Sequence, residues 1–79
     1  MNEIFERLNE VFRDVFDDDS ITVTEHTTAA DIEDWDSLSH ITLISSVEDE
    51  FRMKFSMKEV VEMKNVGEMA AIVSARRKR

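Results

Sequence analysis

Residues that end helices and form tight turns are nearly absent from this chain. It contains no proline and one glycine, Gly67. An all-β fold needs many turns rich in these residues, and a phosphate-binding loop needs several glycines close together. The sequence therefore predicts a mainly helical protein and argues against both of those alternatives.

The first segment has a clear helical period. Between residues 4 and 16, apolar residues recur at intervals of three and four among charged ones. They are Ile4, Phe5, Leu8, Val11, Phe12, Val15 and Phe16. We expect a helix over about 2–16 and then a long loop over 17–36, where 27–32 could hold one short turn. Long ordered loops in compact domains tend to be functional.

Capping residues mark the starts of three further helices. They are Asp34 or Asp36 for the second helix, Ser56 with Glu59 for the third, and Asn65 with Glu68 for the fourth. These helices are expected over about 37–51, 57–63 and 66–75, followed by a basic tail over 76–79. The sequence thus predicts an all-α fold in one domain over 1–79: a four-helix bundle with three longer helices, one short helix and a long loop between the first and second.

Size and charge limit the function. A domain of 79 residues buries only about 60% of the surface of its unfolded chain, which leaves little room for a deep active site. The net charge is −8, and residues 1–75 alone carry 6 basic against 18 acidic residues, a net charge of −12. Nucleic acid is a poor partner for such a surface.

The chain contains no cysteine, which excludes a disulfide framework, a thiolate metal site and a cysteine nucleophile, and which fits a reducing compartment. Its acidic, amphipathic start is unlike a signal peptide, and no apolar run approaches the ~20 residues that span a bilayer. We expect a cytoplasmic protein. We expect the basic end, 76–79, to be a frayed, solvated tail; a localisation or anionic-surface tag is the alternative.

The second predicted helix carries apolar residues on two sides. Leu43, Ile44, Val47 and Phe51 share the side expected to face the core. The outward side carries Leu38, Ile41, Thr42, Ser45, Glu48 and Asp49. Apolar residues bordered by carboxylates can form a docking surface, but single exposed apolar residues are also common without any function. Periodicity alone gives the two interpretations equal weight.

Ser37 lies in the first turn of this helix, beside the carboxylate of Asp36. Helix capping explains either residue alone. It does not explain why Trp35 precedes them and an outward Leu38 follows, which slightly favours a modified or reactive serine.

These residues resemble a known family. Asp36-Ser37-Leu38, followed by a helix ending in Val47-Glu48-Asp49-Glu50-Phe51, is similar to the acyl carrier proteins, in which the serine of Asp-Ser-Leu receives 4′-phosphopantetheine. The likeness extends over almost the whole chain. It implies a carrier and not an enzyme. Such a carrier would hold an acyl or aminoacyl intermediate as a thioester on 4′-phosphopantetheine attached to Ser37. It would present this cargo to enzymes of fatty-acid-like, polyketide, peptide or polysaccharide-modifying biosynthesis.

The resemblance also implies partners. Asp36 would help a phosphopantetheinyl transferase to recognise Ser37 and modify it from coenzyme A. Acyl-loading and acyl-transferring enzymes with basic docking patches would contact the outward side, that is, Leu38, Ile41, Thr42, Ser45, Glu48 and Asp49. The carrier would be a monomer with no nucleic-acid or membrane partner. Trp35, Thr42 and Ser45 depart from the usual fatty-acid carriers, and the Trp-Asp-Ser-Leu-Ser-His form looks more like stand-alone carriers of specialised pathways.

Other functions stay open at this point. One is a helical adaptor module in which Ser37 is only a helix cap. Another is a hydrolase built on Asp36, Ser37 and His40, for which the chain lacks a Gly-x-Ser-x-Gly elbow and a second loop to form an oxyanion hole. We expect His40 on the core side of its helix, near the loop or lining a cargo cavity. No metal site is predicted, because the acidic runs lack the glycine and glutamate of an EF-hand.

Overall fold

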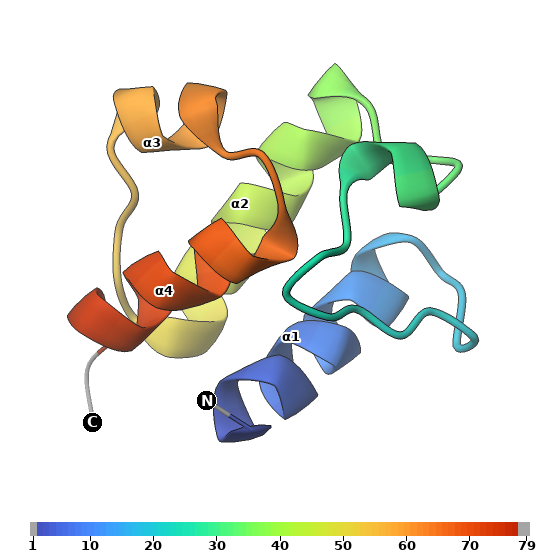
Figure 1. Cartoon of the computed structure of the whole chain (residues 1–79), viewed down its shortest axis with the longest axis horizontal. Coiled ribbons are helices and arrows are strands. Elements are labelled where there is room, and N and C mark those ends of the chain that lie inside the picture. The colour runs from blue at the N-terminus through green and yellow to red at the C-terminus, as the bar shows by residue number, and fades with distance from the viewer. Residues whose placement is uncertain (1, 78–79) are drawn as a thin grey trace.

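The computed structural model describes residues 2–77, and the regular secondary structure within this range is all helical, with no strand. In chain order the elements are α1 (Asn2–Val15), the 3₁₀ helix η1 (Ala29–Asp31), α2 (Ser37–Phe51), α3 (Met57–Glu62) and α4 (Val66–Arg76). The predicted fold class, three longer helices and one short helix with a long loop after the first, is confirmed (Figure 1). None of the helices within 2–77 combines the length and apolar character that crossing a bilayer requires.

Local backbone conformation sets the helix ends. α1 stops one residue before the expected end, and Asp17 just beyond it adopts the left-handed conformation with φ of 51°. Arg52 caps the end of α2 in the same conformation, with φ of 53°, which turns the chain into the connector. α3 is one residue shorter than expected, and α4 is one residue longer.

The core lies between α1, α2 and α4. α1 packs against both other helices and buries Ile4, Leu8, Val11 and Phe12 from its apolar stripe. The predicted core face of α2 is confirmed, since Leu43, Ile44, Val47 and Phe51 are all buried. α4 contributes Val66, Met69, Ala70 and Val73. In contrast, α3 has no buried residue, so other contacts must hold it in place.

The long loop is fixed by hydrogen bonds to α1 and α4. The side-chain oxygen of Asn9 in α1 accepts from the backbone N–H of Val23 at 2.6 Å, and Val23 itself is buried. Nε of Arg13 donates to the carbonyl of Ile21 at 2.7 Å. At the start of α4, the backbone N–H groups of Val66 and Gly67 donate to loop carbonyls at 2.8 and 3.0 Å. The loop therefore joins the start of α4 to α1.

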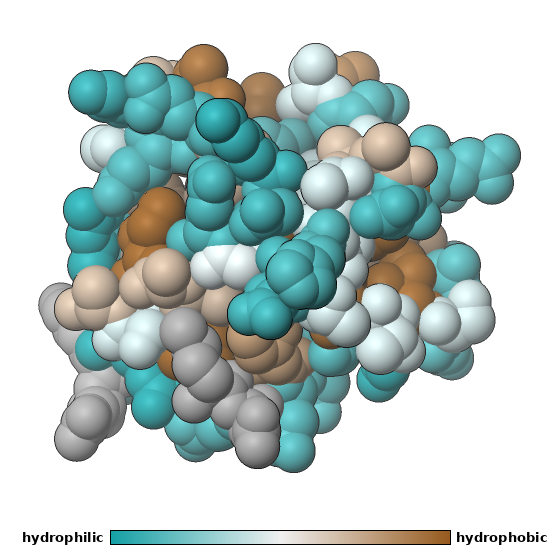
Figure 2. All heavy atoms as spheres, in the orientation of Figure 1, coloured by the Kyte–Doolittle hydropathy of each residue, from teal (hydrophilic) through white to brown (hydrophobic). Residues whose placement is uncertain are grey.

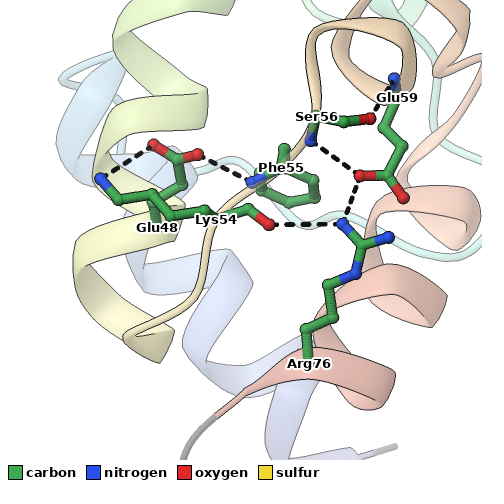
Figure 3. A network of polar contacts seen from close by, with 6 residues as sticks. All are labelled: Glu48, Lys54, Phe55, Ser56, Glu59 and Arg76. Atoms are coloured by element: carbon green, nitrogen blue, oxygen red, sulfur yellow. Dashed lines mark hydrogen bonds and ion pairs between the residues drawn. The ribbon is translucent and has the colours of Figure 1, made fainter.

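A polar network holds α3 against the rest of the molecule (Figure 3). Ser56 and Glu59 form the predicted capping box, with the backbone N–H of Ser56 donating to Oε1 of Glu59 at 2.8 Å. Arg76, at the end of α4, donates to the same carboxylate and to the backbone carbonyl of Lys54. The last turn of α4 is thus linked to the first turn of α3.

The expectation of a frayed, solvated tail is wrong for Arg76 and Arg77. Arg76 forms an ion pair with Glu59, and Arg77 forms one with Glu3 of α1 at 2.7 Å. The second pair brings the two ends of the described chain to the same side of the molecule (Figure 1). The remaining tail residues, 78–79, lie outside the described residues.

Candidate functional site

The start of α2 is held by a reciprocal cap. Oδ1 of Asp36 accepts from the backbone N–H groups of Leu38 and Ser39 at 3.0 and 2.9 Å. In return, the backbone N–H of Asp36 donates to Oγ of Ser39 at 2.8 Å. Of the two predicted caps, Asp36 is the one used. The bond from the Ser39 backbone N–H is the main reason why the pKa of the Asp36 carboxyl is lowered.

Ser39 was missed as a member of the site. Its Oγ also donates to the carbonyl of Asp34 at 2.9 Å, so it ties the last loop residues to the first turn of α2. The sequence held a signal for it, because Asp36 and Ser39 have the three-residue spacing of a capping box. The last residue of a capping box is usually glutamate or glutamine, and here it is serine.

Ser37 is the first residue of α2 and is exposed. Within the described residues, its hydroxyl takes part in none of the bonds that form the cap, which come from Asp36 and Ser39. The adaptor hypothesis assumed that Ser37 serves as the helix cap, and the structure contradicts that assumption. A free hydroxyl at a helix N-terminus is accessible to a partner, and the helix dipole favours a phosphate placed there.

Trp35 and His40 form a chain of hydrogen bonds behind Ser37. Nε1 of Trp35 donates to Nδ1 of His40 at 3.0 Å, and Nε2 of His40 lies 3.1 Å from the carbonyl oxygen of Val60 in α3. Since Nδ1 accepts a bond and a carbonyl cannot donate one, His40 is the neutral tautomer that carries its proton on Nε2. Both ring nitrogens are therefore engaged away from Ser37. This arrangement argues against the hydrolase hypothesis.

A cavity of about 430 Å³ opens beside Ser37. Its lining comes from the end of the loop, the start of α2, α3 and the turn before α4: Ala29, Trp35, Asp36, Ser37, His40, Val60, Val61, Met63, Lys64 and Asn65. The position of His40 at a cavity agrees with the expectation from its place on the helix. The free serine hydroxyl at the edge of a partly apolar cavity fits a covalently attached group with a long flexible arm.

The outward side of α2 is exposed as predicted from its periodicity. Leu38 and Ile41 are 78% and 65% exposed, and Thr42, Ser45 and Asp49 are also exposed. α3 adds two apolar residues that the sequence analysis did not place on the surface, Met57 and Val61, which are 78% and 75% exposed. In Figure 2 hydrophobic residues emerge along the upper edge, over α3 and the start of α2, and others show between hydrophilic residues elsewhere on the same face.

Glu48 departs from the expected outward set. Its side chain is only 16% exposed, and Oε2 accepts from the backbone N–H of Phe55 at 2.8 Å (Figure 3). Oε1 lies 3.8 Å from the ammonium group of Lys54. The left-handed turn at Arg52 brings the connector back over α2 and presents the Phe55 N–H to this carboxylate. The Glu48 carboxylate is therefore bonded within the molecule and does not belong to the exposed outward side of α2.

Comparison with known proteins identifies the type of site. A family model described as "Phosphopantetheine attachment site" matches residues 6–73, which is most of the chain. The chain belongs to this family. The acyl carrier protein of Lactobacillus acidophilus is 29% identical to this carrier over 73 residues, which cover 92% of this chain and 91% of that protein.

A solved structure agrees with both the family and the fold of this carrier. It is the solution NMR structure of a holo acyl carrier protein from Geobacter metallireducens, with a TM-score of 0.86 and 47% identity over 91% of this chain and 83% of that one. Together the comparisons confirm an acyl carrier protein, a carrier and not an enzyme, with phosphopantetheine as its prosthetic group. Its partners accordingly include a phosphopantetheinyl transferase and acyl-handling enzymes.

Proposed function

We propose that Ser37 is the attachment residue and that the protein presents an acyl or aminoacyl cargo on a phosphopantetheine arm bound there. The observation that carries this proposal is the free, exposed hydroxyl of Ser37 at the N-terminus of α2, beside a cavity. The cap formed by Asp36 and Ser39 supports the proposal, because it holds this turn in place without using the Ser37 hydroxyl.

The residues of this chain position the attachment point, and they do not activate it. A serine hydroxyl is a weak nucleophile without a base beside it, and both nitrogens of His40 are engaged elsewhere. The proton on the Ser37 hydroxyl must therefore be taken by a group of the transferase. Once attached, phosphopantetheine supplies a thiol that can carry an acyl group. The Asp34 and Asp36 carboxylates beside its phosphate would keep the arm mobile by charge repulsion.

We place the docking surface on Leu38, Ile41, Thr42, Ser45 and Asp49. Leu38 and Ile41 supply exposed apolar contacts, and the net charge of −8 attracts basic patches on the acyl-handling enzymes. Long-range attraction of this kind speeds encounters without tight binding, which suits a monomeric carrier that must leave each enzyme. The cargo belongs to fatty-acid-like, polyketide, peptide or polysaccharide-modifying biosynthesis, and the loading enzyme selects it.

The mass of the intact protein tests the attachment residue. After incubation with coenzyme A, Mg²⁺ and a broad-specificity phosphopantetheinyl transferase, the wild type should gain the mass of one phosphopantetheine. Ser37→Ala should gain none, because it lacks the accepting hydroxyl. Ser74→Ala is the matched control, since it removes another exposed serine, in α4 and away from the proposed docking surface, and should be modified like the wild type. An unmodified wild type, or a modified Ser37→Ala, would contradict the proposal.

A further inference from the structure

One side of the cavity beside Ser37 is a polar wall. Trp35, His40 and Val60 all line it, and they are the residues joined by the hydrogen bonds at 3.0 and 3.1 Å. None of the buried core residues lines the cavity. Trp35 lines the cavity and also packs on the buried ring of Phe12, so on this side the wall lies between the cavity and the core.

Aromatic packing on α1 holds the wall in place. The Trp35 ring meets the ring of Phe12 edge-on, with centroids 5.3 Å apart, and lies 6.4 Å from the ring of Phe16. Phe12 is fully buried in the core. Through Trp35, His40 and the Val60 carbonyl, the wall connects α1, α2 and α3. Movement of α3 away from α2 would break the bond between His40 and Val60.

A cargo can pass this wall only by separating polar partners. A chain inserted between His40 and Val60 or Trp35 would leave an indole N–H, an imidazole nitrogen or a carbonyl in an apolar setting without a hydrogen bond. The cost of one such unpaired group exceeds the gain from burying one further methylene group. Burial of cargo therefore becomes unfavourable at the wall, although it is favourable along the apolar lining residues Val61, which is 75% exposed, and Met63.

We propose that Trp35 and His40 are specificity-determining residues that limit the sheltered cargo to a short acyl group. The proposal rests on the proposed function, since the cargo must be attached at Ser37 to enter this cavity. Groups that fit between the entrance and the wall are shielded from water. The outer part of a longer chain stays on the surface of the carrier, where its partners must accept it.

A series of acyl groups of increasing length tests the limit. The wild type is loaded from acetyl-, butyryl-, hexanoyl-, octanoyl- and dodecanoyl-coenzyme A with the transferase, and the mass of each product is checked before its melting temperature is measured. The melting temperature should rise from acetyl to butyryl or hexanoyl and should not rise further with the two longest chains. A continued rise through dodecanoyl in the wild type would overturn the proposal.

Variants of the wall locate the limit. His40→Ala removes both hydrogen bonds of the wall and opens space behind it. The melting temperature of this variant should therefore keep rising up to the octanoyl form or beyond. Ser74→Ala changes an exposed residue of α4 that does not line the cavity, and it should keep the limit of the wild type. If His40→Ala does not fold, Trp35→Phe, which keeps a ring but loses the indole N–H, should move the limit by a smaller step. An unchanged limit in the folded wall variant contradicts the proposal.

The mass check separates this proposal from the one on which it rests. If the wild type is not modified at Ser37, the proposed attachment residue fails. If every product has the expected mass but the melting temperature follows chain length without a limit, the attachment stands and the wall does not determine the cargo.

Discussion

Asp36 combines a structural contact with a charge, and two substitutions separate them. Its Oδ1 accepts two backbone N–H groups at the start of α2, as asparagine at this position also could. Asp36→Asn should therefore melt close to the wild type, whereas Asp36→Ala should melt about 5 °C lower, because the cap is lost. Thermal unfolding followed by circular dichroism measures both.

The same pair of variants tests the role proposed for the charge. If the transferase recognises the carboxylate, Asp36→Asn should be modified at Ser37 more slowly than the wild type although its stability is retained. Equal rates of modification for Asp36→Asn and the wild type would show that Asp36 acts only as a cap. A large loss of stability in Asp36→Asn would show that the cap needs the charge.

At the site, the spacing of residues in the sequence predicted those features that depend only on residues close together in the chain. The Asp-Ser-Leu tripeptide at a predicted helix start drew attention to Asp36 and Ser37, and periodicity put Leu38 on the outward side. The chain from Trp35 through His40 to Val60 could not be predicted, because it depends on where the loop and α3 fold against α2. Glu48 was misplaced for the same reason, since its acceptor role depends on the path of the connector.

At the level of elements, Gly67 is required by the contact between α4 and the long loop. Its N–H donates to the carbonyl of Glu25, and a β-carbon at position 67 would lie 2.6 Å from that oxygen. Replacement of a helical glycine by alanine ordinarily stabilises. Here Gly67→Ala should destabilise by about 1–3 kcal/mol, because the loop backbone must move. Chemical denaturation measures the change in the free energy of unfolding.

A second substitution in α4 provides the control. Ala71 is exposed in the same helix, so Ala71→Gly should cost about 1 kcal/mol through helix propensity alone. Opposite substitutions would then both destabilise α4, one through the contact with Glu25 and the other through propensity. If Gly67→Ala is more stable than the wild type, the loop backbone at Glu25 can move away from the new β-carbon without loss of stability.

The helices were predictable from sequence, and the arrangement of the loop was not. Apolar residues at intervals of three and four, with caps at Asp36, Ser56 and Asn65, determine where the helices form. The loop has no such period. It is held by bonds such as Asn9 to Val23, between residues 14 positions apart, whose pairing depends on the complete fold.

For the whole molecule, ion pairs offset a strongly acidic composition. With a net charge of −8, like charges repel across the surface, but arginines join segments far apart in the chain. Arg7 pairs with Glu50 between α1 and α2, Arg77 with Glu3 between α4 and α1, and Arg76 with Glu59 between α4 and α3. The basic residues that looked like a tail thus take part in closing the bundle.

The contact between Glu59 and Arg76 should make stability depend on pH. The Ser56 backbone N–H and the Arg76 guanidinium hold the pKa of the Glu59 carboxyl below its ordinary value of 4.5. A carboxyl whose pKa is lower in the folded state contributes stability that is complete above its unfolded pKa and is lost as the pH falls through its folded pKa. The network around α3 should therefore weaken below about pH 4.5, while α1, α2 and α4 keep their apolar contacts.

Glu59→Gln isolates this effect, because glutamine can still accept the Ser56 N–H of the capping box but has no charge for Arg76. The variant should melt below the wild type near neutral pH, and the difference should shrink as the pH falls below about 4.5 and through the lowered pKa of the wild-type carboxyl, where this carboxyl becomes neutral as well. Glu62→Gln, an exposed carboxylate of the same helix, should follow the wild type over this range. Melting curves at each pH decide the matter: a constant difference between Glu59→Gln and the wild type would mean that the carboxylate's charge does not hold α3 to α4.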